Sequence, residues 1–286
     1  MSDIADEDLY EELLSRNQFV RLPSSSIRGI HESVIDKEHY EAPGGLESVA
    51  YELLNPETQI HFSRHVSEIV REDDSSWRVR YRDHMSDEET TSEKFDKIVL
   101  TPPVPQVVDL LKHSDLKVPE VLTQVKYSSR FAVALYPENP NSFLRPKWSC
   151  AYTKGKRLVF ARFHTRSILL HASVPFTMSH YDDESTDDVV SILSSDFKKY
   201  MGWSELPHFS RVKCHRWRYS QTSGIGGAEK GVLEIHPGLL VAGDGILGSN
   251  FDRCSKSARD TVELILDDKS SSHYRSSTAH KVSSKY

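Results

Sequence analysis

Several features are scarce or missing in this sequence of 286 residues. Its three cysteines, Cys150, Cys214 and Cys254, are scattered and odd in number, so they indicate neither a disulfide framework nor a zinc-ligand spacing. No run of about 18 apolar residues occurs, so no transmembrane helix is predicted. Residues 1–8 are acidic and contain no apolar stretch, so no classical signal peptide is predicted. A cytoplasmic location is therefore expected, with secretion left open.

An excess of positive charge is also missing. The formal net charge is −6, which excludes a general attraction to nucleic acid or to an anionic membrane surface. The hydrophobic residues make up 37% and the charged residues 27%, a balance typical of a globular protein with one large or two smaller domains. We therefore expect neither nucleic acid nor a membrane as partner.

Two common catalytic signatures are absent. No GxSxG segment is present, so the fourteen histidines and many serines alone do not indicate a hydrolase. His61 and His65 have the spacing of helical zinc ligands, but the glutamate of HExxH is missing and the local pattern alternates as in a strand. No metal site is predicted.

The most informative stretch begins near residue 238. Leu239 to Ala242 form a short apolar run bounded by glycines, which predicts a buried strand. Ser249 or Asn250 can cap a following helix, in which apolar residues recur every three or four positions. They are Phe251, Cys254, Ala258, Val262 and Ile265. A strand that leads through glycines into a helix N-terminus favours binding of an anion or a polar ligand.

Gly243, Gly245 and Gly248 also spell GxGxxG. The dinucleotide-binding fingerprint needs a second strand after the helix, and here a serine-rich stretch follows instead. Asp244 lies inside the turn, where a carboxylate suits ribose or ribityl hydroxyls better than phosphate. A standard Rossmann motif at this position is therefore disfavoured.

Ala-Gly-Asp-Gly-x-x-x-Ser-Asn-Phe-Asp at 242–252 resembles the C-terminal flavin motif of the renalase family, within the larger group of flavin amine oxidases. Further segments resemble that family in the same order, so the resemblance covers nearly all of residues 9–266. They are Leu22–Ser25, Ala42–Leu46, Arg64–Val66, Ile98–Pro105, Tyr127–Arg130 and Trp217–Gln221.

The resemblance implies FAD as the cofactor and assigns residues to it. Those implied to contact FAD are Val66, Thr101, Gly243, Asp244, Gly245, Ser249, Asn250 and Phe251. Asp244 would meet the ribityl–phosphate region, and Val66 would lie against the adenine. Trp217 and Tyr219 would lie on the substrate side, although family members carry histidine where this chain has Tyr219. Trp217 and Tyr219 could instead be part of a packed strand face. Val66 could be an ordinary sheet residue, and Thr101 could belong to a rigid turn at a domain boundary.

One departure from the family is large. The family begins with a strand, a GxGxxG turn and a helix that hold the pyrophosphate and adenosine of FAD, and no such unit precedes the matching segments here. We therefore expect a truncated or alternatively started form that binds FAD poorly.

Periodicity and resemblance together predict an α/β (α+β) fold with two interleaved domains. A partial, Rossmann-like FAD/NAD(P)-binding domain is expected at 41–105 and 237–268, and a substrate domain with a mixed β-sheet at 1–40 and 106–236. Residues 269–286 are expected to be disordered. Strands are predicted at 58–63 and 95–100, and a helix at 189–201.

The function implied by the resemblance is FAD-dependent oxidation of aberrant isomers of reduced nicotinamide dinucleotides, with O₂ as electron acceptor and H₂O₂ as product. Two alternatives stay open. One is oxidation of a true amine, and the other is a non-catalytic isoform or interaction protein. The sequence does not identify the substrate or the oligomeric state.

Overall fold

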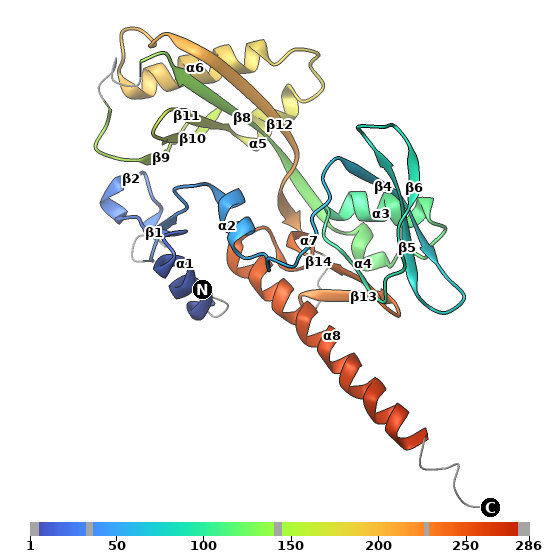
Figure 1. Cartoon of the computed structure of the whole chain (residues 1–286). Helices are drawn as coiled ribbons and strands as arrows, with labels where there is room; N and C mark the ends of the chain where they lie inside the picture. The colour runs from blue at the N-terminus through green and yellow to red at the C-terminus, as the bar shows by residue number, and fades with distance from the viewer. Residues whose placement is uncertain (1–5, 33–36, 140–144, 226–228, 280–286) are drawn as a thin grey trace, which may run out of the picture. The chain divides into compact units, whose positions relative to one another are not determined.

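The computed structural model describes residues 6–32, 37–139, 145–225 and 229–279, with residues 268–279 described by their backbone alone. The chain divides into two compact units (Figure 1). Unit 1 takes residues 1–6, 57–127 and 221–286, and unit 2 takes residues 7–56 and 128–220. Because each unit is assembled from separated segments, the predicted interleaving of two parts is present in the fold.

Unit 1 contains two three-stranded sheets and the helices around them. Its elements are β4 (Arg64–Arg71), β5 (Trp77–Asp83), β6 (Glu89–Thr91), β7 (Ile98–Leu100), α3 (Val104–His113), α4 (Glu120–Thr123), β13 (Val232–His236), β14 (Leu239–Ala242), α7 (Asp244–Leu247) and α8 (Phe251–Ala279). The antiparallel sheet has the order β4-β5-β6, and α3 lies against β4 (Figure 1). The second sheet has the order β13-β14-β7, with β14 parallel to β7.

The strand predicted at 58–63 is wrong. These residues form a loop, and the side chains of Ile60 and Phe62 are 44% and 66% exposed. Alternation of apolar residues forms a strand only where a neighbouring strand supplies a hydrogen-bonded ladder, and the described sheets of unit 1 pair other segments. The predicted strand at 95–100 is confirmed only for 98–100, and Phe95 instead bridges to Trp77.

The core of unit 1 joins both sheets to α3. Trp77 is fully buried, and its indole N–H donates to the carbonyl of Pro237 at 3.1 Å. Val107 and Leu111 from α3 pack in the same cluster as Leu239 and Val241 from β14. This packing fixes the end of β14, where the glycine-rich turn begins.

Unit 2 is built around a six-stranded sheet. Its elements are α1 (Glu7–Ser15), β1 (Val20–Arg21), η1 (Ser24–Ser26), β2 (Ile27–Arg28), β3 (Tyr40–Glu41), α2 (Leu46–Glu52), β8 (Lys126–Pro137), β9 (Cys150–Tyr152), β10 (Leu158–Phe163), β11 (Ile168–Ala172), α5 (Val174–Ser179), α6 (Asp187–Met201) and β12 (Phe209–Gly224). The strand order is β12-β8-β11-β10-β9-β2. The first two residues of β8 and the last four of β12 belong to unit 1.

Helix α6 confirms the helix predicted at 189–201. It lies against β10 and β11 (Figure 1), and its buried residues Val189, Leu193 and Phe197 recur at helical spacing. They pack on the alternate residues of the strands that point to the same face, which include Val133 and Leu170. One apolar stripe and one apolar sheet face therefore form the core of this unit.

His171 on β11 makes the stability of unit 2 sensitive to acid. Its ring lies 5.3 Å from that of Phe160, and burial, reinforced by the Arg130 guanidinium, lowers the pKa of His171 to about 4. The folded state then binds fewer protons than the unfolded state between pH 6.5 and 4, so stability is complete above the unfolded pKa and falls as the pH falls.

We expect acidification across this window to cost roughly 3 kcal/mol of stability through His171. The measurement is urea unfolding between pH 7 and 4 for the native chain, for His171→Gln and for the control His61→Gln, which alters an exposed loop histidine. The free energy of unfolding should depend less steeply on pH in His171→Gln, and the control should behave like the native chain. Equal slopes in all three proteins would contradict this assignment.

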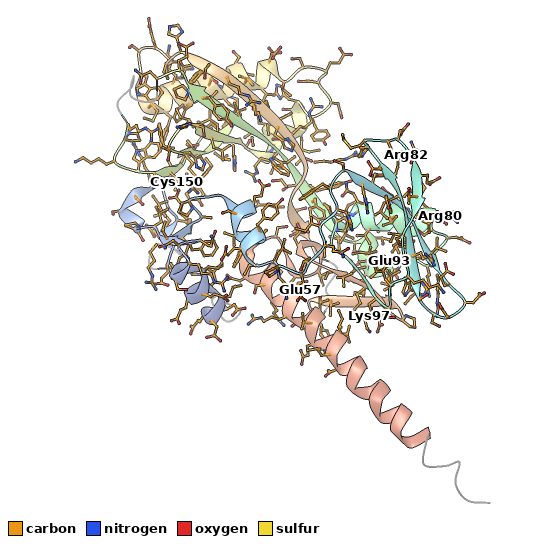
Figure 2. All side chains as sticks on the ribbon, viewed as in Figure 1. Glu57, Arg80, Arg82, Glu93, Lys97 and Cys150 are labelled. Atoms are coloured by element: carbon orange, nitrogen blue, oxygen red, sulfur yellow. The ribbon has the colours of Figure 1, made fainter. Side chains whose placement is uncertain are left out.

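Among the residues described, no helix is both long and apolar enough to cross a membrane. The three cysteines are free thiols, and Cys150, labelled in Figure 2, is buried on β9. Within the same residues, no group of three or more histidine, cysteine or carboxylate side chains has a metal-site arrangement.

The predicted mixed α/β class is confirmed. Contacts divide the chain near residues 56, 127 and 220 instead of at the predicted domain boundaries, and the functional domains stay predictions. The helix of the C-terminal segment continues to Ala279, and residues 280–286 of the predicted tail lie outside the described part.

Candidate functional site

The strand, glycine turn and helix predicted for 239–266 are present. β14 is buried along its whole length and is followed by Gly243, whose φ of 105° and ψ of −159° favour glycine. One short helical turn, α7, lies between Gly243 and Gly248, where the sequence alone indicated only a turn. The predicted open groove in front of the α8 N-terminus stays a prediction.

Thr101 and Gly243 follow two neighbouring parallel strands. β7 and β14 pair through Val241 and Leu100, so the residues that follow them meet at one edge of the sheet. A side chain built on Gly243 would approach Thr101 no closer than 3.6 Å, to its carbonyl oxygen. In open α/β sheets the carboxyl ends of parallel strands are where ligands bind. The structure thus brings together two residues that the resemblance assigns to FAD.

The Asp244 carboxylate is the centre of a hydroxyl network. Tyr127 donates its phenolic O–H to Oδ1 at 2.8 Å, and Ser249 donates its hydroxyl to Oδ2 at 2.9 Å. Burial, followed by the hydrogen bond to Asp244, raises the pKa of Tyr127 above its usual range. Tyr127 therefore keeps its proton and remains a donor to this carboxylate.

Ser249 links the turn to the end of β12. Its Oγ accepts from the backbone N–H of Thr222 at 2.8 Å, and its own N–H donates to Oγ1 of Thr222 at 3.0 Å. Both groups of Ser249 are therefore used within the protein, and its placement orients Asp244.

Asn250, one of the two residues predicted as the cap, caps α8. It is exposed, and its Oδ1 accepts from the backbone N–H of Arg253 at 2.8 Å, as an N-cap side chain does. Phe251 is the first residue of the helix and is partly buried. The α8 N-terminus thus lies directly after the Asp244 network, with its positive dipole end beside the turn.

Gly245 has a packing role. It is buried, and an added Cβ would lie 2.2 Å from Cγ2 of Val104 and 2.9 Å from the Tyr127 hydroxyl. The absence of a side chain lets α7 rest directly on the first turn of α3. Its role in holding FAD stays a prediction.

We expect Gly245→Ala to destabilise the chain by about 1–3 kcal/mol through overpacking. The double variant Gly245→Ala/Val104→Ala should lose about 1 kcal/mol less stability than the sum of the losses in the two single variants. The reason is that the smaller side chain at position 104 makes room for the added methyl group. Urea unfolding measures all three variants. Strictly additive losses would contradict the close contact.

Sequence reasoning missed Ser257 on α8. It is fully buried, its Oγ accepts from the backbone N–H of Gly243 at 2.8 Å and donates to the carbonyl of Gly231. Ser257 lies three residues after Cys254, on the apolar stripe, so a polar residue at an apolar position was the available signal. Thr222 carried no comparable signal.

Val66 lies in a separate groove of unit 1, of about 860 Å³, between β4, β5 and α3. Val66 is 37% exposed and sits at a β-bulge opposite Tyr81. The groove is lined by Arg64, His65, Val66, Ser67, Arg82, His84, Glu89, Pro102, Gln106, Asp109, Leu110 and His113. Figure 2 shows Arg82 together with Arg80 on β5, where Arg80 forms an ion pair with Glu68 at 2.6 Å. Pro102, the residue after Thr101, lines the same groove as Val66.

Trp217 and Tyr219 lie on β12 within unit 2. The Trp217 side chain is 50% exposed, and its ring contacts that of His215 edge-on at 4.2 Å. The guanidinium of Arg218 lies 5.9 Å from the Tyr219 ring. β12 is an end strand of its sheet, and the substrate-side role of both aromatic residues stays a prediction.

Comparison with known proteins supports the resemblance inferred from the motifs. No model of a protein family matches the chain. Mouse (Mus musculus) renalase is 28% identical over 278 residues, which cover 91% of this chain and 78% of the renalase sequence. A crystal structure of aklavinone-11 hydroxylase, in a ternary complex with FAD and aklavinone, superposes with a TM-score of 0.44 at 11% identity. That match covers 69% of this chain but only 35% of the hydroxylase, and no function is inferred from it. The predicted resemblance to renalase is thus confirmed across nearly the whole chain.

Proposed function

We propose that this chain is an FAD-dependent oxidoreductase of the renalase type. The observation that carries the proposal is the Asp244 carboxylate, held by two hydroxyl donors at the carboxyl ends of β7 and β14 and just before α8. The similarity to renalase over 91% of the chain supports the same conclusion.

The residues of the turn fit a flavin. A Cβ on Gly243 would be in ordinary van der Waals contact with Thr101, at 3.6 Å from its carbonyl oxygen, and the φ of 105° is the stronger reason for glycine here. Each carboxylate oxygen of Asp244 accepts one hydrogen bond in the turn and has capacity for another, as hydroxyls of a ribityl chain require. The positive end of the α8 dipole favours an electron-rich group beside it.

The roles of the protein groups follow from this fit. Asp244 would hold the ribityl chain, with Tyr127 and Ser249 fixing the direction of its carboxylate. Trp217 and Tyr219 would contact the substrate. A bound FAD would supply the redox chemistry, which is hydride acceptance from the substrate and electron transfer to O₂. We assign isomers of reduced nicotinamide dinucleotides as substrates and the cytoplasm as the location.

FAD binding by residues 1–286 alone is proposed to be weak. The segments before residue 41 contain no GxGxxG, the element that supplies pyrophosphate contacts in the family. The turn at 243–250 and Val66 would contact only other parts of the cofactor.

The test is an oxidase assay with excess FAD. Residues 1–286, and a chimera that carries a family-type strand–GxGxxG–helix unit before them, are mixed with isomeric dihydronicotinamide dinucleotides, and H₂O₂ is measured. Ordinary NADH and a set of amines serve as comparisons. We expect H₂O₂ from the isomers in the chimera and little from residues 1–286. Turnover of amines alone would indicate an amine oxidase, and no turnover in either protein would indicate a non-catalytic chain.

A further inference from the structure

A cationic hollow of about 700 Å³ lies in unit 2, between the β9–β10 turn and the end of α6. It is lined by Thr153, Lys154, Gly155, Lys156, Arg157, Leu158, Asp196, Lys199 and Tyr200. The lining has four cationic side chains and one carboxylate, in a chain whose net charge is −6. The hollow is therefore positively charged, although the protein as a whole is negatively charged.

The backbone of the turn is anchored at several points. Ser173 donates its hydroxyl to the carbonyl of Lys156 at 2.6 Å and its N–H to the carbonyl of Arg157 at 2.7 Å. The Gly155 N–H donates to Oγ1 of Thr153 at 3.2 Å, and a Cβ on Gly155 would lie 2.6 Å from the carbonyl oxygen of Leu158. The lysines of this turn thus extend from a fixed backbone.

Among the described residues, one of the four cations has a carboxylate partner. Arg157 forms a two-pronged ion pair with Asp196, at 2.9 Å through Nε and 2.5 Å through Nη2. Within the part of the chain that the structure describes, Lys154, Lys156 and Lys199 form no ion pair. Three ammonium groups around one small hollow repel each other, and a multivalent anion would relieve that repulsion.

Part of the lining of the hollow is apolar and aromatic. Leu158 is buried, and the ring of Tyr200 has the Arg28 guanidinium 5.2 Å from its centre. Ammonium groups and an apolar surface in one lining suit an anionic group attached to an organic body.

We propose that this hollow binds a small organic phosphate. The phosphate would contact Lys154, Lys156 and Lys199, and the organic body would rest on Leu158 and Tyr200. The shared chemistry is a phosphate ester or diphosphate, supplied either by a free nucleotide or by a lipid headgroup. The site lies in unit 2 and does not depend on the proposed flavin function.

The test uses residues 1–286 with two probes, ADP in solution and phosphatidylcholine vesicles containing phosphatidylinositol 4,5-bisphosphate. Affinity is measured by calorimetry for ADP and by co-sedimentation for vesicles. Lys154→Ala/Lys156→Ala/Lys199→Ala should weaken binding by about tenfold or more, since exposed ion pairs contribute up to about fivefold each. ADP binding would identify a free phosphate as the source, and vesicle binding without ADP binding a headgroup.

Two controls separate a built site from general attraction by charge. Lys37→Ala/Lys112→Ala/Lys117→Ala removes the same charge from exposed lysines elsewhere and should keep native affinity. Gly155→Ala changes no charge but distorts the anchored turn, and should weaken binding. Circular dichroism checks the fold of each variant. The proposal is overturned if neither probe binds, or if both triple variants lose affinity equally.

Discussion

Residues 1–286, purified without added flavin, are expected to be colourless and to bind FAD at least about a thousandfold more weakly than the chimera with a family-type N-terminal unit. That unit supplies backbone N–H groups and a helix N-terminus for the pyrophosphate. Three charge-assisted hydrogen bonds at about 1.5 kcal/mol each already account for a factor of this size.

The measurement is flavin fluorescence during titration with FAD, together with the absorption spectrum after desalting. Poor solubility should accompany weak binding, because Ile60, Phe62 and Val99 expose apolar surface in unit 1. Residues 239–242 contribute no open strand edge, since β14 lies between β13 and β7. A stable yellow monomer with one flavin per chain would show that the residues present suffice for binding.

Asp244→Ala is expected to have two effects. In residues 1–286 it should lower the free energy of unfolding by about 3–6 kcal/mol, because two hydrogen bonds to a carboxylate contribute about 1.5–3 kcal/mol each. In the chimera it should also weaken FAD binding by about ten- to a hundredfold. Tyr127 and Ser249 lose their acceptor in the variant, which lowers the stability. The ribityl hydroxyls would lose the same carboxylate, which would weaken FAD binding.

Two further variants separate stability from binding. Asp244→Asn keeps one acceptor oxygen and the side-chain shape, and should lose less stability than Asp244→Ala. Asp73→Ala removes an exposed carboxylate and should change stability by less than about 0.5 kcal/mol. Full FAD affinity in a folded Asp244→Asn or Asp244→Ala chimera would refute the ribityl role.

Local patterns predicted the elements that combine periodicity with a clear boundary. Helix α6 has an apolar stripe along its length. β14, the glycine turn and the start of α8 follow each other directly between residues 239 and 251. Apolar and polar residues alternate at 58–63, but no partner strand pairs with this segment, and the predicted strand does not form. A strand depends on a neighbour distant in sequence, whereas a helix bonds within itself.

The contacts of the candidate site were predictable only in part. Asp244 and Ser249 followed from the motif and lie in one turn, but Tyr127 is 117 residues from Asp244 in the sequence, and Thr222 is 27 residues from Ser249. No periodicity relates such pairs, because topology brings them together. The need for glycine at position 245 could not be predicted either, because it depends on the close approach of Val104.

The central claim, that the turn at 243–251 holds the flavin, is tested most directly by amide hydrogen exchange in the chimera with and without FAD. We expect slower exchange on FAD binding at residues 243–251, with further protection near Val66 and Thr101, and no such change in the Asp244→Ala chimera. Full flavin occupancy with unchanged exchange at 243–251 would contradict the claim.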